Sequence, residues 1–131
     1  MGLSLRNIIK EEVDSFQWIR DIQSSYPQYF HTRVEDFIER YATHWEGAEV
    51  FFEPIKDRYE NSGLVELGRV WMDDNGGSWY WDLLKNENHD IFKVELFEKL
   101  DGEPSYEIVD NSSFKTFEEA LEWIYDGMIE G

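Results

Sequence analysis

Apolar residues recur at helical spacing in two segments near the N-terminus. In the first, from Asn7 to Ile22, they stand four and three residues apart and so share one helical face. The second follows a T-x-x-E capping box, Thr32 and Glu35, and runs to Gly47. Pro27 separates them, so the pattern predicts two N-terminal helices with a break between. The apolar positions are Ile9, Val13, Phe16 and Ile19, then Val34, Phe37, Ile38, Tyr41, Ala42 and Trp45.

The same pattern returns at the C-terminus. Thr116 and Glu119 form a second T-x-x-E box, and apolar residues follow it at spacings of three and four. Gly127 or Gly131 would end this helix. Its apolar stripe consists of Phe117, Ala120, Leu121, Ile124, Tyr125 and Met128.

Between these helices the period changes to two, which is typical of strands. The short links Asn75-Gly76 and Asp101-Gly102 permit only antiparallel neighbours. We therefore expect one α+β domain over residues 1–131, with an antiparallel meander of four or five strands. The two N-terminal helices and the C-terminal helix would pack on one face of this sheet. The expected strands are Glu49–Glu53, Leu64–Met72, Ser78–Leu84, Ile91–Leu100 and Tyr106–Val109.

Composition narrows the class of protein. The 131 residues include 29 acidic and 12 basic side chains, for a net charge of -17, and no cysteine. A disulfide framework, a thiol nucleophile and a cysteine zinc site are therefore excluded. A nucleic-acid binder that neutralises phosphates is not expected at this charge. Apolar residues make up 41% of the chain, enough for a folded core, and no apolar run could span a bilayer, so we expect a cytoplasmic protein.

Motifs for catalysis or metal binding do not emerge. The three histidines, His31, His44 and His89, lack the H-x-x-x-H spacing, and no G-x-S-x-G elbow or phosphate-binding glycine loop occurs. Asp73-Asp74-Asn75-Gly76 fails the calcium-loop pattern, and Ser112-Ser113 is interpreted as loop and cap residues. We expect no catalytic residue, cofactor or metal. An enzyme that uses two carboxyl groups remains a third hypothesis, because 29 acids cannot be sorted from sequence.

Aromatic residues cluster in the middle of the chain. In a strand, Trp79 and Trp81 share one face and Tyr80 takes the other. Trp71 would lie across the hairpin from the two tryptophans. One interpretation is cross-strand aromatic pairing under the helices, and the other is an exposed patch that binds a partner. Phe97 is the exception to the alternation of its strand, since it would lie on the same face as the charged residues Lys93, Glu95 and Lys99.

The charge is unevenly distributed. Residues 86–131 hold 13 acids and 3 bases, for -10 of the total -17. On the C-terminal helix, Glu118, Glu122 and Asp126 stand four apart, and no base follows Lys115. Like charges at this spacing oppose helix formation by a few tenths of a kcal/mol per pair, about 0.2–0.5. Such a helix favours a partner that supplies positive charge.

The leading hypothesis is a non-enzymatic inhibitor that binds a basic, nucleic-acid-handling protein such as a nuclease, without contacting nucleic acid or membrane itself. A phage anti-defence protein, either an anti-CRISPR protein or a DNA mimic, is one form of it. The alternatives are an immunity protein against a nuclease toxin, or a structural or accessory phage protein that uses an aromatic patch. A homodimer is left open. The expected partner-binding residues are Glu107, Asp110, Glu118, Glu119, Glu122, Asp126, Trp79 and Trp81.

Two segments resemble known proteins. Ile8 to Ile22, IIKEEVDSFQWIRDI, is similar to an N-terminal segment of small proteins of large tailed phages, which implies a phage gene product in a bacterial host. Asn111 to Ile124 resembles the ending of SMI1/KNR4-type immunity domains. The N-terminal pattern of that family is missing, so the chain is not assigned to it.

Overall fold

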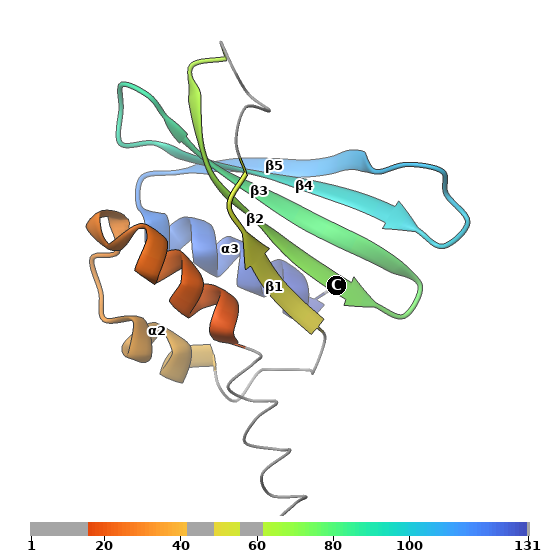
Figure 1. Ribbon diagram of the computed structural model, residues 1–131, viewed down its shortest axis with the longest axis horizontal. Helices are drawn as coiled ribbons and strands as arrows, with labels where there is room; N and C mark the ends of the chain where they lie inside the picture. The colour runs from red at the N-terminus through yellow and green to blue at the C-terminus, as the bar shows by residue number, and fades with distance from the viewer. Residues whose placement is uncertain (1–15, 42–48, 56–61, 131) are drawn as a thin grey trace, which may run out of the picture.

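The fold is built on a five-stranded antiparallel sheet with strand order β1-β2-β3-β4-β5 (Figure 1). The computed structural model describes residues 16–41, 49–55 and 62–130. Each strand pairs with its neighbour in sequence, so the sheet is the predicted meander. The strands are β1 (Glu49–Glu53), β2 (Leu64–Asp74), β3 (Gly77–Asn86), β4 (Phe92–Leu100) and β5 (Glu107–Phe114).

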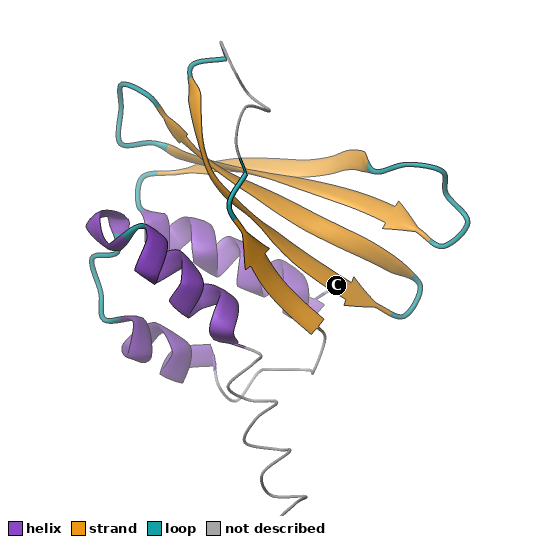
Figure 2. Ribbon diagram, in the orientation of Figure 1, coloured by secondary structure: helices purple, strands orange, loops and turns teal. Residues whose placement is uncertain are grey.

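The helices lie together on one face of this sheet (Figure 2). The described part of the first helix covers residues 16–25, and the 3-10 turn η1 (Pro27–Tyr29) follows it, with proline at its start. Helix α2 (Val34–Tyr41) and helix α3 (Phe117–Glu130) complete the layer. The predicted α+β architecture is therefore confirmed. The expected start of the first helix at Asn7 and the end of the second at Gly47 lie outside the described residues.

The core lies between the sheet and the helical layer. All six residues of the predicted stripe on α3 are buried, and so are Phe16, Ile19 and Ile22 of the first helix. From the sheet, Val70, Trp81 and Leu83 contribute fully or almost fully buried side chains. Alternation in the strands and a period of three to four in the helices thus bring apolar faces together.

Two glycines are required by the geometry. Gly76 has φ of 98° in the two-residue turn between β2 and β3, a conformation that L side chains rarely adopt. Gly68 lies under the ring of Phe52, where an added Cβ would come within 2.0 Å of Phe52 Cε2. The sheet is therefore irregular near the Glu66/Gly68 register shift and tightly packed there.

A tyrosine ties the helical layer to this irregular part of β2. The Tyr26 hydroxyl donates to the carbonyl oxygen of Leu67. Burial, with a smaller contribution from Tyr29, raises the pKa of Tyr26, so the donor stays protonated at neutral pH.

Two local predictions were wrong, and a third is decided between its two alternatives. Ser112 and Ser113 lie in β5, which extends beyond Val109 because its residues continue to pair with β4. Of the two glycines expected to end α3, Gly127 lies inside the helix, and the helix ends at Glu130, directly before Gly131. The Thr32 capping box does not form, because Glu35 pairs with Arg20 (3.2 Å) and α2 begins at Val34.

Candidate protein-binding surface

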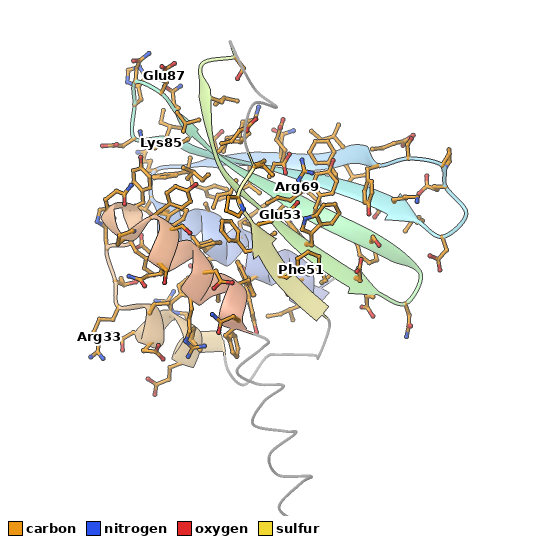
Figure 3. The ribbon with its side chains drawn as sticks, in the orientation of Figure 1. Arg33, Phe51, Glu53, Arg69, Lys85 and Glu87 are labelled. Carbon is orange, nitrogen blue, oxygen red and sulfur yellow. The ribbon has the colours of Figure 1, made fainter. Side chains whose placement is uncertain are left out.

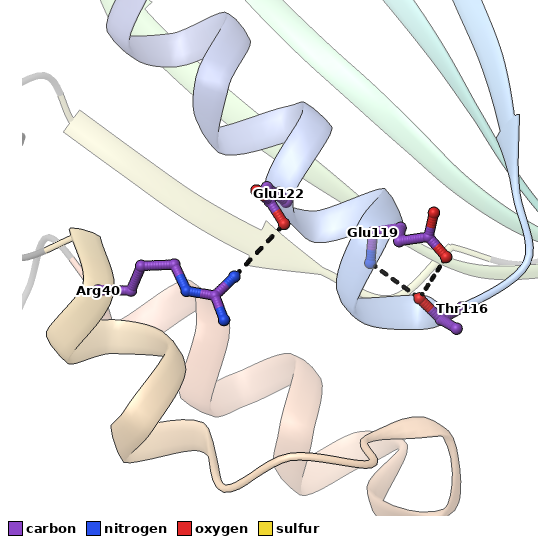
Figure 4. A network of polar contacts seen from close by, with 4 residues as sticks. All are labelled: Arg40, Thr116, Glu119 and Glu122. Atoms are coloured by element: carbon purple, nitrogen blue, oxygen red, sulfur yellow. Dashed lines mark hydrogen bonds and ion pairs between the residues drawn. The ribbon is translucent and has the colours of Figure 1, made fainter.

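The acidic stripe of α3 faces other parts of the chain. The Glu118 carboxylate accepts hydrogen bonds from the backbone N–H groups of His31 and Thr32. Glu122 forms an ion pair of 3.5 Å with Arg40 of α2 (Figure 4). The expectation that Glu118, Glu122 and Asp126 form one solvent-facing stripe without compensation is therefore corrected. The physical reason is that the groups which compensate these acids come from another part of the chain. Arg40 and the N–H groups of His31 and Thr32 belong to the N-terminal layer, not to α3.

The other two acids expected on α3, Glu119 and Asp126, lie at the N-terminal cap of the helix and on its exposed side. The backbone N–H of Glu119 donates to Thr116 Oγ1 (3.2 Å), and the hydroxyl donates to Glu119 Oε1 (2.9 Å), so the second capping box forms (Figure 4). Asp126 is exposed on the side of α3 away from the sheet. Glu118, Glu119 and Glu122 thus each form contacts within the chain itself.

The two tryptophans expected on a binding patch belong to the helix-covered face. Trp81 is 2% exposed and packs in the core beside Gly127, so it cannot meet a partner. Trp79 is half-buried against the core, and its Nε1 donates to Glu98 (2.9 Å). Both tryptophans therefore lie under the helices as one interpretation expected, but none of their cross-strand partners is aromatic. Trp71 is not on their side, because it pairs with Tyr80 on the opposite face.

A row of aromatic rings crosses that opposite face instead. Phe51, Trp71, Tyr80 and Phe97 are cross-strand partners from β1 to β4, and the register continues to Ile108 of β5. The rings contact in sequence, with centroid separations of 6.1, 4.9 and 4.6 Å. Tyr106 lies over the middle of the row, 5.0 Å from Tyr80 and 5.9 Å from Trp71. The row is exposed mainly at its ends, Phe51 and Ile108, at 48% and 50%.

This row is not among the sequence-based predictions, although two of its residues indicate it. Phe97 is the one apolar exception among the polar residues on its side of β4, and alternation places Tyr80 on the face away from the tryptophans. Two aromatic residues on the polar face of neighbouring strands are typical of a second apolar patch.

A buried ion pair stands beside the aromatic row. Asp82 is 0% exposed, and Arg69 binds it with two hydrogen bonds, Nε to Oδ1 at 2.6 Å and Nη2 to Oδ2 at 3.1 Å. The guanidinium also lies 4.0 Å from the centroid of the Tyr80 ring. On β1, Glu53 accepts a hydrogen bond from Trp71 Nε1 (2.8 Å), near Phe51 and Arg69 (Figure 3). Both Asp82 oxygens are engaged by Arg69, which suits a structural ion pair rather than an acid–base residue.

The terminal strand β5 combines exposed acids with exposed apolar side chains. Glu107 and Asp110, both expected partner contacts, are exposed, and neither forms an ion pair with any residue that the structure describes. Ile108 and Val109 between them are 50% and 49% exposed. We call these four consecutive residues, 107–110, the β5 surface. Exposed apolar side chains that stand beside exposed acids along an edge strand are typical of a surface that contacts a partner.

The described residues offer no metal site and no membrane-spanning helix. Among them, no group of three or more histidine or carboxylate side chains could hold a metal ion. None of the helices in this part of the chain has the length and hydrophobicity that crossing a bilayer requires. Comparison with protein-family models, with curated proteins and with solved structures finds no match.

Proposed function

We propose that this chain is a non-enzymatic acidic binding protein that engages a basic, nucleic-acid-handling protein through the β5 surface. The observation that carries the proposal is the pairing of Glu107 and Asp110 with two half-exposed apolar side chains on one terminal strand. The net charge of -17 supports fast encounter with a basic partner. The partner would contribute lysine and arginine, while Ile108 and Val109 would add apolar contacts.

The proposal covers two biological roles. A phage anti-defence protein would block the nucleic-acid site of a host defence protein, and an immunity protein would block a nuclease toxin in the cell that makes it. In both roles the acids would occupy the site where the partner binds nucleic-acid phosphates. Duplex DNA should therefore compete with this chain for the same partner.

The test begins with a low-salt pull-down from bacterial lysate and continues with the purified partner. Affinity should fall at least tenfold between 50 and 300 mM salt, and duplex DNA should displace the chain, because charge pairs dominate the contact. The variant E107K/D110K should weaken binding at least tenfold. Its matched control is E87K/D90K, the same two exchanges at exposed sites of the β3–β4 loop, at the other end of β4.

Two results would contradict the proposal. One is an affinity that does not change with salt, together with no displacement by duplex DNA. The other is an equal loss for E107K/D110K and E87K/D90K, which would make the effect one of net charge alone.

The aromatic row favours a second candidate, a structural or accessory protein whose contacts are apolar. Phe51 is exposed at the β1 end of the row, where its ring stacks on Trp71. In this case the charge would only keep the protein soluble. Affinity would then barely change with salt, and Phe51→Ala would weaken binding more than E107K/D110K.

A further inference from the structure

Strand β5 is a long strand at the edge of the sheet. Among the strands that the structure describes, it is hydrogen-bonded only to β4; its eight residues end the strand order, and six of the eight are exposed. An edge strand presents backbone N–H and C=O groups that can pair with another strand, and proteins usually protect such edges. The other edge, β1, has five residues and is followed directly by Pro54. No proline or lysine occurs within β5.

The two faces of β5 have different chemistry. Asp110 pairs with Leu96, which packs against the core, and Glu107 pairs with Glu98, so both acids lie on the helix-side face. Ile108 pairs with Phe97 and lies on the opposite face, at the end of the aromatic row. A strand added alongside β5 would therefore meet carboxylates on one face and apolar side chains on the other.

Part of β5 is regular enough to accept such a strand. The pairing with β4 shifts register at Leu96/Phe97, where Val109 is the extra residue. From Asp110 to Phe114 every residue pairs one-to-one with β4. The N–H of Asn111 donates to the carboxylate of Asp110 (2.8 Å), so an added strand would have to displace this carboxylate to use that backbone donor.

We propose that β5 binds an extended segment of the partner as a sixth strand, with lysine or arginine on the helix-side face and an apolar residue beside Ile108. This rests on the proposed function, because it takes the partner to be basic. Backbone hydrogen bonds would give affinity, and the alternation of basic and apolar residues would give specificity. A second copy of this chain fits poorly, because each copy carries -17 and both edges would bring Glu107 and Asp110.

The test uses a defined probe, the acetylated and amidated peptide Arg-Val-Arg-Val-Arg-Val-Arg. Its control is the same peptide N-methylated at alternate residues, which keeps every charge but removes the backbone donors of one edge. We expect the unmodified peptide to bind at least tenfold more tightly. Hydrogen exchange of amides within residues 110–114 should slow at least tenfold when it is bound, and amides of β1 should not change.

The outcomes separate this inference from the proposed function. Equal affinity of the two peptides, with no added protection in β5, would overturn the added strand. Salt-dependent binding of the natural partner would still support the proposed function in that case. Protection of residues 110–114 that rises with protein concentration, without peptide, would also overturn the inference, because the occupant would then be a second copy.

Discussion

Helix α3 and strand β5 both carry acidic side chains, but the fold uses the two sets differently. On α3, Glu118 accepts two backbone N–H groups and Glu122 pairs with Arg40, both from the N-terminal layer. On β5, Glu107 and Asp110 have no ion pair with any described residue. A dense run of acids therefore does not locate a binding surface by itself, since tertiary contacts decide which of the acids remain available.

The apolar residues of α3 and β5 also differ, because those of α3 are buried and those of β5 are exposed. All six residues of the apolar stripe of α3 are buried, so this face of the helix packs in the core and is not available to a partner. On β5, Ile108 and Val109 remain about half exposed, at 50% and 49%. Exposed apolar side chains between unpaired acids make β5, rather than α3, the better candidate for a partner contact.

The largest effect that would sharpen this comparison is expected from Glu118→Lys. Lysine cannot accept the N–H groups of His31 and Thr32, and it puts a positive charge near the N-terminus of α3. The free energy of unfolding should fall by about 2 kcal/mol. Urea denaturation measures it, with Glu107→Lys as the matched exchange on β5. If both variants lose the same stability, the acids of α3 and β5 do not differ as described.

A smaller effect is expected from Thr116→Ala. This removes the hydroxyl that accepts the N–H of Glu119 at the start of α3. The loss should be about 1 kcal/mol, which is typical of an N-cap. Thr116→Ser keeps the hydroxyl and should recover most of it, as followed by thermal unfolding. A loss that serine does not recover would mean that the methyl group, not the cap, matters here.

Sequence predicted the elements of this fold well, because each has a local cause. Alternation and the Asn75-Gly76 turn gave the meander, and the six-residue stripe of α3 is buried as expected. Errors occurred where long-range contacts decide. Glu35 forms an ion pair with Arg20 instead of a capping box, and β5 continues through Ser112 and Ser113 because β4 offers partners.

The binding surface was predicted only in part, for the same physical reason. Glu107 and Asp110 were identified from charge and are exposed. Trp81 was named as a partner contact but is buried, because sequence cannot say which face of a sheet the helices cover. The compensation of Glu118 and Glu122 comes from residues more than 80 positions away in the chain. No pattern within α3 could have revealed it.

The smallest effect on stability is expected from E107K/D110K, and it is the most direct test of the comparison. The exchange changes the net charge from -17 to -13, since each acid-to-lysine change adds two. Because neither acid forms an ion pair among the described residues, the unfolding free energy should change by less than about 0.5 kcal/mol. The sign should favour the folded state at low salt, because self-repulsion decreases, and this gain should vanish in 0.5 M salt. A loss above about 1 kcal/mol in urea denaturation would reveal an intramolecular role for these acids. In that case β5 would resemble α3, and its acids could not be assigned to a partner.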